Sequence, residues 1–112
     1  MKKTLKKARY VAIFVTVPDL KTARKIARKA LESKQIACAN ILPKIESHYW
    51  WQGKIDKSNE LLLIMKTTLS KIKELETTVL SNHPYQTPEF IATKIENGFQ
   101  DYLDWINNSV GK

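Results

Sequence analysis

The sequence predicts an α+β domain in which a four-stranded sheet carries two helices on one face, with a third helix at the end of the chain. Three observations predict this fold. Short β-branched or apolar runs typical of buried strands alternate with segments whose apolar residues recur every three or four positions, as in helices. The segments follow in the order strand, helix, strand, strand, helix, strand, helix. The 112 residues are enough for one hydrophobic core and one domain.

The first strand is expected at residues 10–17, which are rich in β-branched and aromatic side chains. Pro18 then turns the chain, and the Asp19 carboxylate can accept hydrogen bonds from the first amides of a helix. The apolar side of this helix consists of Leu20, Ala23, Ile26, Ala27, Ala30 and Leu31. The opposite side is basic and consists of Lys21, Arg24, Lys25, Arg28 and Lys29. The pattern is typical of an amphipathic helix lying close against a sheet.

Residues 36–51 and 54–67 are expected to form a long hairpin around the turn at Gln52 and Gly53. Pro43 interrupts the first of these strands, and because proline has no amide hydrogen we expect a bulge or an edge position there. In the second strand residues 61–65 are apolar at every position, so both faces must be covered. Helices can cover one face, and another subunit can cover the other.

A second helix is marked by Ile72, Leu75, Val79 and Leu80. We expect Thr68 or Ser70 to cap its start and the His83–Pro84 step to end it, because the residue before a proline disfavours the helical conformation. A fourth strand is expected at residues 90–95. A short last helix is marked by Phe99, Tyr102, Leu103 and Ile106 and is expected to end near residues 107–108.

This order of elements is the ferredoxin-like split βαβ arrangement, β-α-β-β-α-β, followed by a C-terminal helix. Right-handed crossovers place both main helices on one face of the sheet. The other face is left open, and an open apolar face is expected to find a partner.

The composition limits the classes of partner. The chain is expected to consist of a basic tail at residues 1–9 and a single domain at residues 10–112. The formal net charge is +8, and much of it lies in the tail and on the first helix of the domain. No nucleic-acid-binding motif accompanies the charge, so we expect no nucleic-acid partner. No apolar run is long enough to span a membrane, so no membrane partner is expected. The single cysteine, Cys38, excludes an internal disulfide and favours the cytoplasm.

The segment 81–90 is the most chemically varied part of the chain. His83 can serve as a metal ligand or have a structural role, such as capping the preceding helix. Pro84 and Pro88 stiffen the segment. Tyr85 lies between them, and Glu89 can accept a hydrogen bond from a lysine or tyrosine, or ligate a cation.

Two further groups of residues could contribute to a site. Trp51 ends a run of three aromatic residues beside the hairpin turn, and at least one of them must face outward, towards a subunit or a ligand. Glu60 and Lys66 are an even number of positions apart on one strand, so they share a face and could form an ion pair. Cys38 is expected to be a buried, unreactive side chain. Phosphate-binding glycine loops and nucleophile motifs are absent, so we do not expect an enzyme.

Four segments together carry a resemblance to the CutA family of divalent-cation-tolerance proteins. They are residues 15–19 (VTVPD), 37–43 (ACANILP), 49–55 (YWWQGKI) and 83–89 (HPYQTPE). Their order and spacing match the family from about Tyr10 to Ile106. The resemblance implies a ferredoxin-like fold assembled as a homotrimer similar to that of the PII signalling proteins, a role in tolerance of copper and other divalent cations, and no established catalytic activity.

The resemblance also implies site residues. The copper ligands of bacterial relatives correspond to Val15, Asn82 and His83, of which only His83 is a good ligand. A polar pocket near the subunit interface corresponds to Trp51, Glu60, Lys66, His83, Tyr85 and Glu89. We therefore expect two kinds of partner. One is the other subunits of the homotrimer, and the other is a metal ion, copper or another divalent cation. The alternative is a PII-like signalling module that binds a small molecule in the intersubunit pocket.

Overall fold

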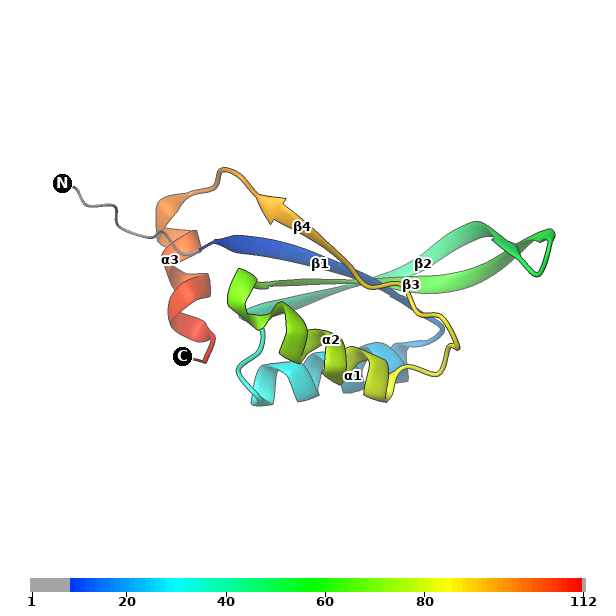
Figure 1. The fold of residues 1–112 in the computed structure, drawn as a ribbon, viewed down its shortest axis with the longest axis horizontal. Helices are drawn as coiled ribbons and strands as arrows, with labels where there is room; N and C mark the ends of the chain where they lie inside the picture. The colour runs from blue at the N-terminus through cyan, green and yellow to red at the C-terminus, as the bar shows by residue number, and fades with distance from the viewer. Residues whose placement is uncertain (1–8, 112) are drawn as a thin grey trace.

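The computed structural model describes residues 9–111, so most of the predicted basic tail lies outside the described residues. The strands and helices follow the predicted order (Figure 1). They are β1 (Tyr10–Val17), α1 (Leu20–Glu32), β2 (Cys38–Trp51), β3 (Lys54–Thr68), α2 (Ile72–Asn82), β4 (Ile91–Ile95) and α3 (Gln100–Ser109). Within residues 9–111, every helix is too short or too polar to cross a lipid bilayer.

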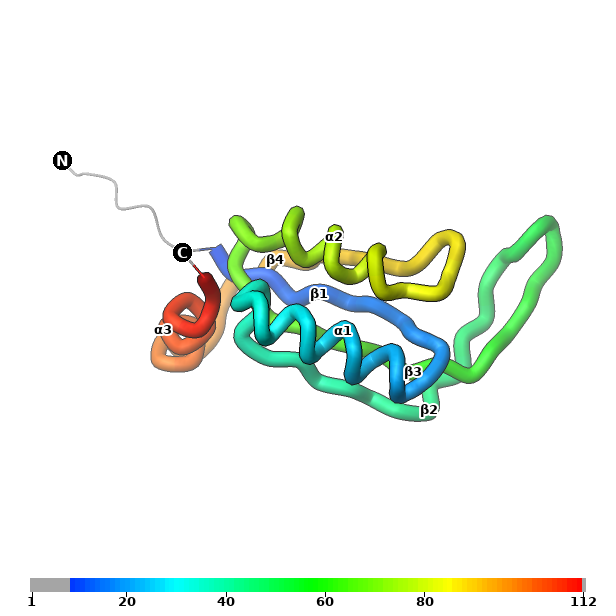
Figure 2. Tube along the Cα trace, turned by 90° about the horizontal axis from the view of Figure 1, so that it is seen from below, coloured from blue at the N-terminus to red at the C-terminus, as the bar shows by residue number. Residues whose placement is uncertain are grey.

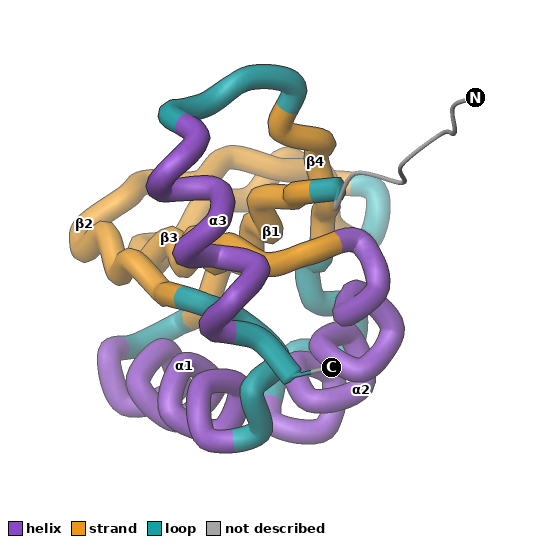
Figure 3. Tube along the Cα trace, turned by 90° about the vertical axis from the view of Figure 1, so that its left-hand side faces the viewer, coloured by secondary structure: helices purple, strands orange, loops and turns teal. Residues whose placement is uncertain are grey.

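The four strands form one sheet in the order β2-β3-β1-β4, and every neighbouring pair is antiparallel. Helices α1 and α2 lie side by side beneath the sheet in Figure 1, and Figure 2 shows the same pair from below. Helix α3 crosses the end of the sheet that is opposite to the tip of the β2–β3 hairpin (Figures 1 and 3). The predicted ferredoxin-like arrangement with its C-terminal helix is therefore confirmed.

The hydrophobic core lies between the sheet and the two helices. Alternate residues of the central strands face the helices, among them Val15 of β1 and Leu63 and Met65 of β3, and all three are fully buried. The helices contribute small and branched side chains to the same cluster, namely Ala23, Ile26, Ala27, Ala30, Leu75 and Val79. The small residues of α1 allow it to lie close to the sheet, as predicted.

The opposite face of the sheet has no helix across its middle (Figure 1). On this face Phe14 and Ile64 are half-buried neighbours, while Leu42 and Ile91, near its two edges, are exposed. We call this surface the open face. Residues 61–65 thus alternate between the core and the open face, and only their core-facing members are covered within one chain.

The β2–β3 hairpin projects beyond the body as an arm (Figure 1). The register shifts between Leu42 and Ile45, which confirms the bulge predicted at Pro43. At the tip, Gln52 and Gly53 both have positive φ angles, 49° and 79°, as a two-residue type I′ turn requires. Trp50 is 73% exposed beside this turn, in agreement with the prediction that an aromatic side chain faces outward there.

The prediction for the start of the second helix was wrong. A short 3₁₀ turn at Leu69–Lys71 precedes α2, and neither Thr68 nor Ser70 caps it with a side-chain hydrogen bond to the backbone. Instead the two hydroxyl oxygens lie 3.2 Å apart and bond to each other. Cys38 also differs from expectation, because it is half-buried rather than buried.

Candidate functional site

The loop from His83 to Phe90 carries the chain from the end of α2 to the start of β4, around the end of β1. His83 has an extended conformation, with φ −101° and ψ 134°, so α2 ends at Asn82. The following proline disfavours a helical His83, and this part of the prediction is confirmed. The loop therefore brings the side chains of its His83, Tyr85 and Glu89 to the end of the sheet where β1 leads into α1.

The imidazole ring of His83 connects two segments of backbone. Its Nε2–H donates a hydrogen bond to the carbonyl oxygen of Thr16, at 2.7 Å, and its Nδ1 accepts one from the amide of Tyr85, at 3.2 Å. A carbonyl can only accept and an amide can only donate, so these partners define a neutral ring with the proton on Nε2. Both ring nitrogens are occupied, and a metal ion could bind this residue only by replacing one hydrogen bond.

Tyr85 and Glu60 form a short side-chain hydrogen bond in the site. The Tyr85 hydroxyl donates to the Glu60 carboxylate at 2.7 Å, and Glu60 is only 6% exposed. Burial raises the pKa of the Tyr85 phenol well above its ordinary value, and the hydrogen bond to Glu60 and its negative charge raise it further. The phenol therefore remains protonated at neutral pH and acts as a hydrogen-bond donor.

Glu89 lies close enough to Glu60 for the two charges to interact. Burial raises the pKa of the Glu89 carboxyl, and the negative charge of Glu60 raises it further. We call Glu60, Tyr85 and Glu89 the acidic cluster. The atoms of this cluster that could ligate a metal ion are all oxygens, and oxygen ligands suit hard cations better than copper.

The residues do not form a complete metal site within one chain. In the part of the chain that the structure describes, no three or more His, Cys, Asp or Glu side chains are grouped so as to hold a metal ion. The ligand positions implied by the resemblance do not converge on a copper site either. Val15 is a fully buried core residue, and the Asn82 side-chain amide donates to the carbonyl of Thr78 at 2.7 Å.

Lys66 and Trp51 lie away from the acidic cluster. The Lys66 ammonium donates to the Asn40 side chain at 2.6 Å, and Lys66 is six positions from Glu60 on β3, a separation of about 20 Å. The ion pair considered for Glu60 and Lys66 is therefore not formed. Trp51 pairs with Lys54 beside the turn at the tip of the arm. Four of the six predicted pocket residues thus gather in one chain, and the intersubunit pocket stays a prediction.

Some parts of the site gave no signal in the sequence. The carbonyl group of Thr16 is a backbone atom, so its role depends only on where the loop meets β1. The charge of Asp19 raises the pKa of Tyr85, although Asp19 was expected only as a helix cap. It is also that cap, since its carboxylate accepts from the amide of Thr22 at 2.8 Å, and this hydrogen bond lowers its pKa.

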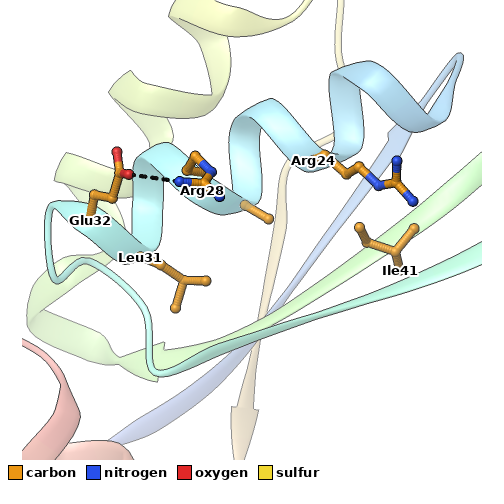
Figure 4. Close-up of a pocket in the computed structure, with 6 residues that line it drawn as sticks. Arg24, Arg28, Leu31, Glu32 and Ile41 are labelled. Carbon is orange, nitrogen blue, oxygen red and sulfur yellow. Dashed lines mark hydrogen bonds and ion pairs between the residues drawn. The ribbon is translucent and has the colours of Figure 1, made fainter.

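Two further hollows lie on the helical side of the molecule. One, of about 450 Å³, lies between α1 and β2, and Figure 4 shows Arg24, Arg28, Leu31 and Ile41 around it. Arg28 forms an ion pair with Glu32 at 3.3 Å there. The other, of about 440 Å³, lies between the start of α1 and the end of α2. Neither contains the acidic cluster.

Comparison with known proteins gives consistent results. The family described as CutA1 divalent ion tolerance protein matches residues 11–109. The divalent-cation tolerance protein CutA of Citrobacter koseri is 42% identical over 100 residues, which cover 89% of this chain and 87% of the relative. The same identity and coverage are found for CutA of Salmonella newport. The resemblance stated from the sequence motifs is confirmed.

Solved structures agree with the fold. The Cut A1 protein of Thermus thermophilus matches with a TM-score of 0.89 and 39% identity, covering 91% of this chain and 99% of that protein. CutA1 of Oryza sativa gives a TM-score of 0.90 and 40% identity, with coverages of 93% and 95%. A CutA from Archaeoglobus fulgidus, described as a periplasmic divalent cation tolerance protein, gives a TM-score of 0.88 and 41% identity, with coverages of 91% and 99%.

Proposed function

The chain belongs to the CutA1 divalent ion tolerance family, and we propose that it acts in divalent-cation tolerance as a non-enzymatic, homotrimeric protein of the cytoplasm. The proposed ligand is a divalent cation, copper or another, and the all-oxygen cluster favours a harder cation such as manganese over copper. The acidic cluster, rather than His83, is the proposed place of binding, with the remaining ligands supplied by water or by a neighbouring copy of the chain.

The observation that carries this proposal is the proximity of the Glu60 and Glu89 carboxylates. Burial raises the pKa of the Glu89 carboxyl, and the negative charge of the nearby Glu60 raises it further. A divalent cation placed between them would remove the repulsion and gain two charged oxygen ligands. His83 is less suited, because ligation would break either its hydrogen bond to Thr16 of β1 or the hydrogen bond that it accepts from Tyr85 within the loop.

The chemistry of the cluster also supports a role without catalysis. A general base near neutral pH needs a free lone pair and a matched pKa. The lone pair of His83 Nδ1 accepts from Tyr85, and the raised pKa of Tyr85 keeps its phenol protonated. Cys38, the single thiol, lies 3.6 Å from the Tyr102 hydroxyl, which is not a base that would activate it at neutral pH.

Assembly into a trimer is supported by the open face and by the arm. Phe14, Ile64 and Ile91 line a continuous apolar strip of the sheet, and exposed aromatic side chains extend along the arm. Such surfaces are uncommon on monomers, and aromatic residues are enriched at subunit interfaces. A partner copy would also cover the acidic cluster more fully.

A PII-like signalling function is the second candidate. It is favoured by the hydrogen bond between Tyr85 and Glu60, because a phenol held as a donor beside carboxylates suits a polar organic ligand as well as a cation. Thermal-shift measurements with a panel of metabolites and metal ions separate the two candidates. A metabolite that raises Tm where no metal ion does would favour the signalling function, because a ligand that binds only the folded state stabilises it.

The metal proposal is tested by calorimetric titration of copper(II), zinc(II) and manganese(II) at neutral pH. The wild type is compared with the double variant Glu60→Gln/Glu89→Gln and with His83→Ala. We expect the double variant to lose saturable binding and His83→Ala to retain it. Because copper binds tightest at most nitrogen and oxygen sites, the comparison of variants matters more than the absolute affinity.

Two results would contradict the proposal. Loss of binding in His83→Ala, with retention in the double variant, would make His83 the ligand despite its hydrogen bonds. Absence of binding in all three proteins would remove a direct metal role. Circular dichroism of each variant confirms that the fold is retained before the titrations are compared.

A further inference from the structure

The hollow between the start of α1 and the end of α2 has a chemistry unlike that of the acidic cluster. Its walls include Lys21, Thr22 and Lys25 from α1 and Ser81 from the last turn of α2, and the His83–Pro84 step closes one end. We call it the α1–α2 hollow. Figure 2 shows that the two helices run in opposite directions, so the first turns of α1 lie beside the last turns of α2.

Positive charge in this hollow comes from Lys21 and Lys25, and Asp19 compensates part of it, since the hydrogen bond to Thr22 and then the charge of Lys21 lower the pKa of the Asp19 carboxyl. Lys21 and Lys25 are four residues apart, so they lie on the same side of α1, with their Cβ atoms about 5–6 Å apart. Among residues 9–111, neither ammonium group has a hydrogen bond or an ion pair, whereas Arg28 in the neighbouring hollow is paired with Glu32. The nearby Asp19 carboxylate is already bonded to the amide of Thr22.

The other donors of the hollow are unengaged as well. Within the described residues, the hydroxyl groups of Thr22 and Ser81 have no hydrogen-bond partner. The carbonyl of Thr78, near the end of α2, is covered by the side-chain amide of Asn82. The hollow is therefore an open surface depression of about 440 Å³ whose lining residues carry two ammonium groups and two hydroxyl groups.

We propose that the α1–α2 hollow binds the phosphate groups of a small, soluble oligophosphate ligand through Lys21 and Lys25. A cation is excluded by the two positive charges. A phosphate group offers three terminal oxygens that accept from separate donors, and lysine binds phosphate as a point charge without demanding one fixed geometry. The hollow is lined by residues of α1, α2 and the following loop. Both helices lie on the face of the sheet opposite to the open face (Figure 1), so assembly through the open face leaves the hollow accessible.

The probe for the test is inorganic tripolyphosphate, titrated by calorimetry in low salt. The test variant is Lys21→Gln/Lys25→Gln. The matched control is Lys29→Gln/Lys73→Gln, which also removes two positive charges. Its two lysines are exposed on α1 and α2 but lie outside the hollow. We expect the test variant to bind at least about tenfold more weakly, since it loses two charged hydrogen-bond donors. The control should stay within about twofold of the wild type.

Three outcomes would overturn the proposal. Equal weakening of the test and control variants would mean that binding follows net charge and not a site. Citrate, a polyanion without phosphate, serves as a comparison, and binding as tight as that of tripolyphosphate would refute the assignment to phosphate. Absence of saturable binding by the wild type would show that the hollow is not a binding site. All four side chains are exposed, so loss of folding is not expected to obscure the result.

Discussion

The hydrogen bond between Tyr85 and Glu60 is the contact on which the acidic cluster depends. Removing the hydroxyl in Tyr85→Phe leaves the buried Glu60 carboxylate without its donor. We expect this change to lower the free energy of unfolding by about 1–3 kcal/mol, the usual cost of an unsatisfied buried polar group. Chemical denaturation of the variant and the wild type measures it.

The double variant Tyr85→Phe/Glu60→Gln is the control for that experiment. The neutral amide that Glu60→Gln introduces is less costly to bury without a partner than a carboxylate, so the second change should recover part of the loss. The single variant Glu60→Gln completes the comparison. If the stability losses of the two single variants add up to the loss of the double variant, the contact contributes nothing specific to stability.

Glu89 gives the cluster a dependence on pH. Its pKa is raised in the folded state above the ordinary value of 4.5, so as pH rises the unfolded chain releases this proton first. The folded state then binds more protons than the unfolded state, and stability falls as pH increases from about 4.5 through the folded-state pKa. At neutral pH the charged Glu89 is therefore destabilising.

The variant Glu89→Gln removes this penalty. We expect it to be more stable than the wild type at neutral pH, by less than about 1 kcal/mol because the side chain is only partly buried. The difference should shrink as the pH is lowered through 4.5, because Glu89 is protonated in both states only below that pH. Denaturant unfolding over this pH range measures it. A gain that does not change with pH would have to come from packing and not from charge.

The sequence singled out three residues of the loop as candidates but did not predict their partners. His83, Tyr85 and Glu89 are identified by their density in one short segment and by the family motif. Their contacts with Thr16 and Glu60 join positions far apart in sequence, so only the folded topology decides them. The pairing suggested for Lys66 failed for a related reason, since sharing a face of a long strand does not bring two residues together.

Helix α1 ends in an arrangement that favours glycine. Beyond its last residue, Lys34 has a φ of 58°, the amide of Lys34 bonds to Leu31 and the amide of Gln35 bonds to Ala30. These are the two hydrogen bonds of a Schellman motif, with Lys34 at the left-handed position. A side chain at that position costs about 1–2 kcal/mol relative to glycine.

The variant Lys34→Gly is therefore expected to be more stable than the wild type, by roughly 1 kcal/mol after the greater flexibility of glycine in the unfolded chain is included. Thermal or denaturant unfolding measures the change. Lys34→Ala is the control, because it removes the same charge and keeps the Cβ atom. Equal stabilisation by both substitutions would assign the effect to charge and not to backbone conformation.

Element boundaries followed the sequence wherever backbone chemistry is decisive. Gly53 defines the hairpin turn, Pro43 the bulge and Pro84 the end of α2, because each of these residues restricts or extends the backbone conformations available. The cap of α2 was not predicted, since Thr68 and Ser70 can bond to each other as readily as to the backbone. The alternative hydrogen bonds of a capping side chain have similar free energies, so tertiary packing decides which of them forms.

At the scale of the whole molecule, the two faces of the sheet differ in how far one chain covers them. On the helical side, α1 and α2 cover the core within one chain, and their outer surface is basic on α1. The open face is not covered within one chain, since Leu42 and Ile91 remain exposed beside Phe14 and Ile64. An apolar surface on the sheet favours association of copies there, while the charge on α1 keeps the helical side hydrated.

The substitution Ile91→Asp tests this division of the surface. Ile91 is 52% exposed in one chain and adjoins Phe14 on the open face, so a charge there would be buried without a partner in the assembly. We expect the wild type to sediment as a trimer and Ile91→Asp to sediment as a folded monomer.

The matched control is Leu80→Asp. Leu80 is 47% exposed on α2, on the other side of the sheet, so this substitution should leave the trimer intact. Dissociation in Leu80→Asp and not in Ile91→Asp would place the contact between copies on the helical side of the sheet. A monomeric wild type would contradict the proposed assembly, and the acidic cluster would then have to bind its ligand without help from a neighbouring chain.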